Sequence, residues 1–217
     1  MPITRRALGA LVSLGAIAAL LRLPALRFIT EAFALEPSDV TKPVSLPDMA
    51  LGSLSAPVTI TEYAAPTCPH CAAFSREVFP KIKAAYSDTG KVRWVLREFP
   101  LNAKDAACSM LARSIAGNDS GKYFAVVDVM FRQQDVLVEK TTDTLKLIGR
   151  QAGLSGEAVE QCLKNEALFN KIKADRKYAE EVLKVEGTPT FFINGDEIVG
   201  EAAFEGFDRK IKSLLKS

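Results

Sequence analysis

The sequence has few of the residues that build metal and haem sites. His70 is the only histidine among 217 residues, and there are only four cysteines. A zinc site needs three or four ligands close together, whereas Cys108 and Cys162 each stand alone. Ala72, rather than histidine, directly follows Cys71, which excludes the haem attachment motif. We therefore expect neither a metal nor an organic cofactor.

The sequence also lacks a large excess of charge of either sign. It has 28 Lys and Arg against 26 Asp and Glu, a formal net charge of +2. Four of these basic residues but only one acidic residue lie in residues 1–34, so the remainder carries a net charge of −1. This balance argues against a nucleic-acid partner and against a polybasic membrane anchor.

Residues 1–34 have the pattern of a bacterial export signal. Arg5-Arg6 precede an uncharged apolar stretch from Ala7 to Leu21, and Ala32-Phe33-Ala34 is an A-x-A cleavage site. The paired arginines also resemble a twin-arginine signal. The apolar stretch of 15 residues is short for a membrane span, so we expect cleavage after Ala34; an uncleaved anchor is the alternative. Either way the folded part is predicted to lie in the oxidising periplasm.

The most informative segment is Thr67-Cys68-Pro69-His70-Cys71. Two thiols separated by two residues can form and open a disulfide, which transfers two electrons. If the segment begins a helix, the helix N-terminus and a protonated His70 both favour an anion at Cys68. They predict a lowered Cys68 pKa and a thiolate that attacks and leaves readily. A stabilised reduced form makes the disulfide an oxidant. We expect Cys68 to be exposed and Cys71 to be buried.

The pattern around this segment predicts an α/β fold. Val58–Tyr63 and Val92–Phe99 are rich in β-formers, and the apolar spacing between them predicts a helix kinked at Pro80. Asn194-Gly195, between two short β-rich runs, predicts a hairpin that a closing helix follows. Residues 35–56 are predicted to be an extended lead-in. Helices are predicted at 104–116, 121–133, 142–152, 156–163 and 166–184.

A CxxC motif at the first strand-to-helix turn of such an order is the thioredoxin-like arrangement. We therefore predict a thioredoxin-like fold with an inserted α-helical domain. Residues 57–101 and 184–217 would form the thioredoxin-like domain, and residues 102–183 the insertion.

These residues resemble the DsbA family of exported thiol oxidases. The resemblance rests on Cys68-Pro69-His70-Cys71, on the helical insertion and on Gly187-Thr188-Pro189-Thr190 before the hairpin, and it extends from Val58 to the C-terminus. It implies a monomeric thiol:disulfide oxidoreductase that donates the Cys68–Cys71 disulfide to unfolded exported proteins. It also implies re-oxidation by a membrane quinone-linked partner resembling DsbB.

The resemblance assigns roles to three further residues. Pro189 would be a cis-proline beside the disulfide, with the backbone of Thr188 free to pair with an extended substrate. Thr188 departs from the valine of the best-known oxidases. Glu62, six residues before Cys68, would be the acid that handles the proton of Cys71. An outward-facing strand residue is the alternative for Glu62.

Cys108 and Cys162 both fall in the predicted insertion. Some members of the family have a disulfide in this domain, so a structural disulfide is expected, and two separate buried thiols are the alternative. Trp94 is expected to be a core residue without a functional role.

Two other functions remain open from the sequence. One is a disulfide isomerase or reductase on the same fold, although isomerases usually dimerise through an added domain and residues 35–56 are too short for one. The other is a periplasmic copper-binding redox protein with Cys68 and Cys71 as soft ligands. The absence of a Met/His cluster argues against copper.

Overall fold

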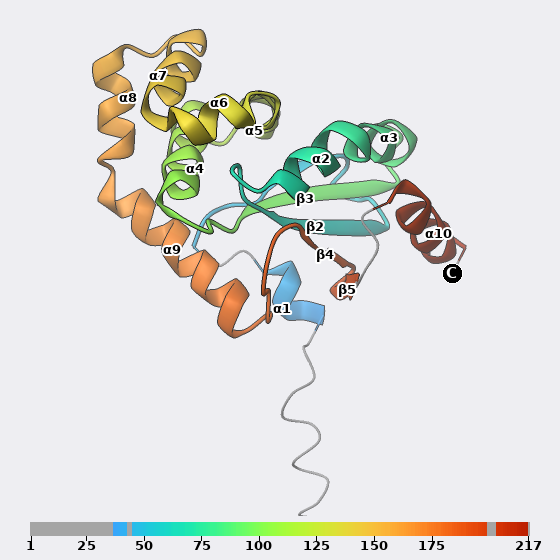
Figure 1. Cartoon of the computed structure of the whole chain (residues 1–217). Coiled ribbons are helices and arrows are strands. Elements are labelled where there is room, and N and C mark those ends of the chain that lie inside the picture. The colour runs from blue at the N-terminus through green and yellow to red at the C-terminus, as the bar shows by residue number, and fades with distance from the viewer. Residues whose placement is uncertain (1–36, 43–44, 199–202, 217) are drawn as a thin grey trace, which may run out of the picture. The chain divides into compact units, whose positions relative to one another are not determined.

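A five-stranded mixed sheet organises the structure, a computed structural model that describes residues 37–42, 45–198 and 203–216 (Figure 1). The strand order is β1-β3-β2-β4-β5. The strands are β1 (Met49–Leu51), β2 (Val58–Ala64), β3 (Val92–Glu98), β4 (Thr190–Ile193) and β5 (Asp196–Ile198). Only β2 and β3 pair in parallel; the other pairs are antiparallel. The sheet confirms the predicted α/β class. The predicted export signal lies outside the described residues.

The connection from β2 to β3 carries the CxxC motif. Helix α2 (Pro69–Glu77) begins directly after Cys68, and Pro69 occupies its first position, where a missing N–H costs no hydrogen bond. The helix ends at Val78, and α3 (Phe79–Ile82) and the π-helical segment η2 (Lys83–Ser87) continue from it. The break immediately before Pro80 confirms the predicted kink.

The hairpin predicted at Asn194-Gly195 is present. Both residues have positive φ, 50° and 97°, as the tight turns that suit twisted strands require. The Asn194 side chain also accepts a hydrogen bond from the backbone N–H of Thr59, at 2.8 Å, which ties the turn to the neighbouring strand β2. Helix α10 (Phe204–Leu214) then closes the chain against the sheet.

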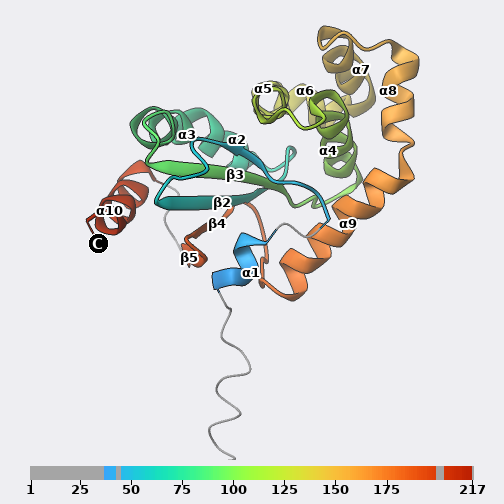
Figure 2. The ribbon, with the colours of Figure 1, turned by 180° about the vertical axis from the view of Figure 1, so that it is seen from behind.

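Residues 102–183 are helical, as predicted. The helices are α4 (Ala103–Ala116), α5 (Ser120–Arg132), α6 (Gln134–Glu139), α7 (Thr141–Gln151), α8 (Gly156–Leu163) and α9 (Glu166–Glu181). Side chains of Asn102, Asp119, Ser155 and Asn165 cap four of them. The sequence did not predict α6, because six residues are too few to show a helical period. Helices α4–α8 form one group, and α9 leads from it toward β4 (Figures 1 and 2).

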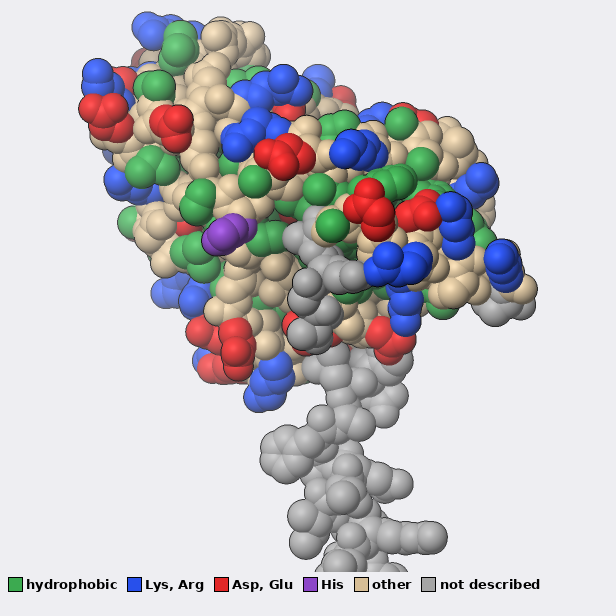
Figure 3. Space-filling view, turned by 45° about the vertical axis from the view of Figure 1, so that its right-hand side comes forward, with side chains coloured by type: hydrophobic (Ala, Val, Ile, Leu, Met, Phe, Trp, Pro, Cys, Tyr) green, Lys and Arg blue, Asp and Glu red, His purple; other side chains and the backbone are tan. Residues whose placement is uncertain are grey.

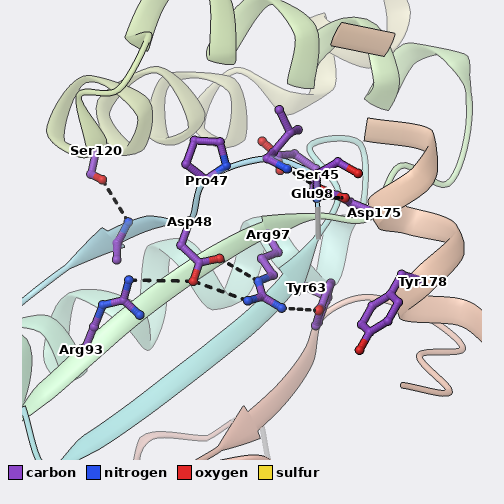
Figure 4. Close-up of polar contacts among 12 residues, drawn as sticks. Ser45, Pro47, Asp48, Tyr63, Arg93, Arg97, Glu98, Ser120, Asp175 and Tyr178 are labelled. Carbon is purple, nitrogen blue, oxygen red and sulfur yellow. Dashed lines mark hydrogen bonds and ion pairs between the residues drawn. The ribbon is translucent and has the colours of Figure 1, made fainter. Parts of the chain in front are cut away.

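The prediction of an extended lead-in over residues 35–56 was wrong. The described part contains α1 (Pro37–Thr41) and β1, which pairs with the outer edge of β3. This pairing satisfies backbone groups of β3 that an extended lead-in would leave without partners. Residues 45–51, which we call the N-terminal strap, are also held by side chains (Figure 4). Asp48 accepts a hydrogen bond from Arg97 at 2.9 Å, and Asp175 accepts one from the backbone of Ser45 at 2.7 Å.

Three apolar clusters fill the interior. One, around Phe74, Trp94 and Phe207, packs α2, α3 and α10 against the sheet. A second, around Tyr63 and Phe192, packs α1 and α9 against it. The third joins the CxxC cysteines to the helices α4–α8. The redox motif therefore lies where the sheet meets the helical segment.

Candidate active site

Residues of the helical segment form hydrogen bonds with the backbone of the CxxC motif and of the residues just before it. The Gln134 side chain on α6 donates hydrogen bonds to the carbonyl oxygens of Pro66, at 2.7 Å, and Cys68, at 2.9 Å. The Asp105 carboxylate on α4 accepts one from the backbone N–H of Thr67 at 2.7 Å. Sequence reasoning missed Gln134 and Asp105, because nothing in the local pattern shows which distant side chains approach the motif.

The expected exposure of Cys68 was wrong. Its residue surface is 5% exposed, against 0% for Cys71, so both are buried and only their order is as predicted. The Cys68 thiol donates a hydrogen bond to the backbone carbonyl of Thr188 at 3.2 Å. The Thr188-Pro189 peptide is cis, as the resemblance implied, and the Thr188 hydroxyl is buried without a hydrogen-bond partner among the described residues.

The surroundings of Cys68 lower its pKa to about 5. The largest cause is a hydrogen bond from the Cys71 thiol, and burial opposes it. The polar side chain of Thr188 and the backbone N–H groups of Cys71 and His70 lower the pKa further. This agrees with the prediction from the helix N-terminus. What His70 contributes is its backbone N–H. Its imidazole is exposed at the surface (Figure 3).

The pKa of Cys71 is shifted in the opposite direction. Burial raises its pKa far above the usual range, and the hydrogen bond to Cys68 and the nearby Glu62 raise it further. All four cysteines are free thiols, so the structure is the dithiol form. In this form one thiol is ready to ionise and its neighbour holds its proton.

Glu62 lies on β2 beneath the motif and is 5% exposed, so the outward-facing alternative was wrong. Burial raises the Glu62 pKa to about 8; a hydrogen bond from Trp94 opposes the shift and the charge of Cys68 adds to it. Trp94 Nε1 donates that bond at 3.2 Å, a contact that the sequence did not predict. Glu62 is therefore a neutral acid near pH 7, rather than the carboxylate expected from the sequence.

A cavity of about 410 Å³ gives Glu62 a route outward. Phe79 of α3 and Phe124 of α5 line it, together with the polar side chains of Lys83 and Asp128. A buried acid that exchanges protons needs such a path to solvent.

Cys108 and Cys162 belong to one apolar cluster. Cys108, on α4, is fully buried, and Cys162, on α8, is half-buried against the same cluster. Burial raises the pKa of Cys108 to about 12. Both are thiols in this structure, so a bond between them stays a prediction. Within the described part of the chain, no three His, Cys, Asp or Glu side chains are grouped to hold a metal.

The family model described as thioredoxin matches residues 45–213, which is more than half of the sequence. The chain belongs to the thioredoxin family. Its structure is similar to that of α-DsbA1 from Wolbachia pipientis, with a TM-score of 0.76 and 29% identity over 83% of this chain and 96% of that chain. BdbD from Bacillus subtilis has the same fold, with a TM-score of 0.70 and 20% identity over 78% of this chain and 94% of that one. These matches confirm the resemblance to DsbA.

Sequence relatives agree with the structural neighbours. A Rickettsia conorii protein named "Putative protein-disulfide oxidoreductase" is 34% identical over 75% of this chain. The match covers 58% of that protein, so the chain spans less than two thirds of that relative's length. The "Disulfide bond formation protein D" of Bacillus subtilis is 25% identical over 86% of this chain and 82% of its own length.

Proposed function

We propose that the chain is an exported thiol:disulfide oxidoreductase that donates its Cys68–Cys71 disulfide to folding periplasmic proteins. The observation that carries this proposal is the contrast between the two thiols. The Cys68 pKa is lowered to about 5, while burial raises that of Cys71. The Cys68 thiolate stabilises the reduced form. Reduction of the disulfide is therefore more favourable, and the disulfide acts as an oxidant.

The reaction begins with the Cys68–Cys71 disulfide. A substrate thiolate attacks the sulfur of Cys68, the S–S bond breaks, and Cys71 leaves with the electron pair and takes up a proton. A second substrate thiolate then attacks the substrate sulfur of the mixed disulfide, and Cys68 leaves as a thiolate. The substrate gains one disulfide and loses two electrons, which the enzyme keeps as its dithiol.

Glu62 is proposed to carry the proton of Cys71. With a pKa of about 8 it is protonated near pH 7 and can supply a proton when Cys71 leaves. On re-oxidation Cys71 must lose its proton, and the Glu62 carboxylate can take it back. The charge of Glu62 raises the pKa of Cys71, which supports a proton path between the two groups.

Thr188 and Pro189 are proposed to bind the substrate. The Thr188 carbonyl oxygen lies 3.2 Å from the Cys68 sulfur, so a polypeptide that reacts at Cys68 must pass beside it.

The substrates are proposed to be unfolded exported proteins, and re-oxidation to come from a DsbB-like membrane quinone reductase. We further propose that the enzyme acts as a monomer without a cofactor, that residues 57–101 and 184–217 form its redox domain, and that Cys108 and Cys162 pair after export. Within the described ranges no helix is both long and apolar enough to cross a membrane.

The deciding experiment is the reduction potential of the Cys68–Cys71 pair, titrated against glutathione. An oxidase is expected to have a potential near ~−120 mV, whereas a value near ~−270 mV would identify a reductase. The Cys108→Ala/Cys162→Ala double variant is the control, because its titration reports the CxxC pair alone.

A further inference from the structure

A groove of about 950 Å³ is lined by α4 and by α9, which contact each other. Its wall on α4 consists of Ala103, Ala106, Ala107 and Met110, which share one face of the helix by their spacing. Three of these four side chains are alanine, and their small size leaves the space open. The α9 wall includes Phe169.

The lining of this groove is largely apolar and partly open to solvent. Leu101 is 47% exposed and Phe169 is 37% exposed, both large apolar side chains. A hollow lined mainly by apolar side chains with a few polar groups is the usual form of a binding pocket. Its volume is within the range of pockets that hold several side chains of a ligand, ~300–1,000 Å³.

The rim of the groove is basic. Lys164, Lys173 and Arg176 line it, against the single acid Glu166. Arg176 is paired with Glu180 at 2.8 Å, so the excess positive charge lies mainly on Lys164 and Lys173. The Lys173 ammonium lies 5.7 Å from the centre of the Phe169 ring, and no acidic side chain in the described part of the chain pairs with it. The groove therefore presents apolar surface and positive charge together, which complements a ligand that is apolar and acidic.

One end of the groove is attached to the redox motif. Asn102, at that end, donates a hydrogen bond from its side chain to the hydroxyl of Thr67 at 3.0 Å. The Asp105 carboxylate binds the backbone N–H groups of both Thr67, at 2.7 Å, and Leu101, at 3.1 Å. The groove therefore begins at residues that contact Thr67, the neighbour of Cys68 in the chain.

We propose that the α4–α9 groove binds the segment of substrate polypeptide that adjoins the reacting cysteine, and that it selects segments with bulky apolar and acidic side chains. The proposal rests on the proposed function, since it makes the groove part of the substrate site. It adds a selection by side chains to the backbone contacts expected at Thr188 and Pro189. Substrate cysteines flanked by acidic and apolar residues would be oxidised first.

The first test measures binding without redox chemistry. Two fluorescein-labelled peptides without cysteine, one alternating Leu and Glu and the other Leu and Lys, are titrated with the reduced full chain, and anisotropy gives each Kd. The acidic peptide is expected to bind more tightly. Lys173→Glu should weaken its binding about fivefold, the scale of one partly exposed ion pair. Equal affinity for the two peptides would overturn the proposal.

The matched control is Lys177→Glu, one helical turn further along α9. Lys177 is paired with Glu181 and does not line the groove, but its reversal changes the net charge by the same amount. It is expected to leave the Kd of the acidic peptide unchanged. If both variants weaken binding equally, the effect is one of overall charge and the proposal fails. Ala103→Phe, at an exposed position of the groove wall, should weaken binding without a change in charge.

The second test separates the groove from the proposed function. Peptides with two cysteines and either an acidic-apolar or a basic-apolar tail are oxidised by the disulfide form, and kcat/KM is compared. Faster oxidation of the acidic peptide, lost in Lys173→Glu, supports the proposal. Oxidation of both at one rate overturns the groove and leaves the oxidase intact. Tight binding of the acidic peptide with no oxidation of either overturns the oxidase alone.

Discussion

Two buried glutamates on neighbouring strands differ in what surrounds them. Glu98, on β3, accepts hydrogen bonds from Arg113 through both carboxylate oxygens, Nη2 at 2.8 Å and Nε at shorter range, and a third from Tyr123 at 2.7 Å. Glu62, on β2, has a single side-chain donor among the described residues, Trp94 at 3.2 Å. Glu98 is paired with a cation, whereas no cation of residues 37–42, 45–198 or 203–216 pairs with Glu62, and burial raises the Glu62 pKa to about 8.

The surroundings of the two glutamates also differ in what they connect. Arg113 also donates a hydrogen bond to the carbonyl oxygen of Pro47 at 2.7 Å, so the Glu98 region fastens the N-terminal strap to α4 and β3. Arg97 and Asp48 extend the same fastening (Figure 4). Glu62 faces a cavity and the CxxC thiols instead. A buried carboxyl without a paired cation holds its proton more tightly, which the proposed relay at Glu62 requires.

The largest expected change in stability comes from removing the cation that pairs with Glu98, which leaves Glu98 buried without a cation, as Glu62 is. Arg113→Met removes the cation and leaves a buried, unpaired carboxylate, which should lower the free energy of unfolding by about 3–5 kcal/mol. Urea denaturation measures the loss. Arg132→Met, which removes an exposed pair with Asp128, is the control and should unfold as the wild type does. A loss no larger than in the control would show that Arg113 does not compensate Glu98.

The next effect comes from removing the charge of Glu62. Its pKa is about 8 when folded and near the ordinary 4.5 when unfolded, so the folded state binds the proton more tightly. Below pH 4.5 this group therefore does not lower the free energy of unfolding. As the pH rises from 4.5 toward 8, the free energy of unfolding falls by at most ~1.36 kcal/mol per pH unit. Glu62→Gln should be more stable than the wild type at pH 8, by about 4 kcal/mol, and nearly equal to it at pH 4.

The same variant tests the proton relay. Glu62→Gln has no group to receive the proton of Cys71, so re-oxidation of the dithiol by oxidised glutathione should slow and lose its dependence on a group with a pKa of about 8. Glu77→Gln, at an exposed position of α2, should change neither stability nor rate. Unchanged re-oxidation in Glu62→Gln would make Glu62 a buried acid without a role in the reaction.

The smallest expected effect comes from Trp94→Phe, which removes the one donor to Glu62. A hydrogen bond to a charged group is worth ~1.5–3 kcal/mol, so the Glu62 pKa should rise by about one unit or more. Loss of packing lowers stability equally at all pH values. The loss at pH 4.5 therefore reports packing, and any additional loss at pH 8 reports the hydrogen bond. Equal losses at both pH values would contradict the assignment.

Much of this structure could be predicted from short stretches of the chain. The hairpin at Asn194-Gly195, the break before Pro80 and the helix that begins at Pro69 all follow from local backbone preferences. The strap was mispredicted because β1 is a strand only through its pairing with β3. Cys68 is buried because Gln134 and Thr188, 66 and 120 residues away in the sequence, pack against it.

The sequence by itself determined which chemistry is present: two thiols two residues apart at the start of a helix, and an acid on the preceding strand. Only the tertiary structure decided how tightly each group holds its proton. A pKa depends on burial and on the charges and donors nearby. For Glu62 these are burial and a tryptophan from the next strand, with no cation paired to it in the described part of the chain, and for Cys68 they include the side chain of Thr188, beyond the whole helical segment. No local pattern in the chain encodes such neighbours.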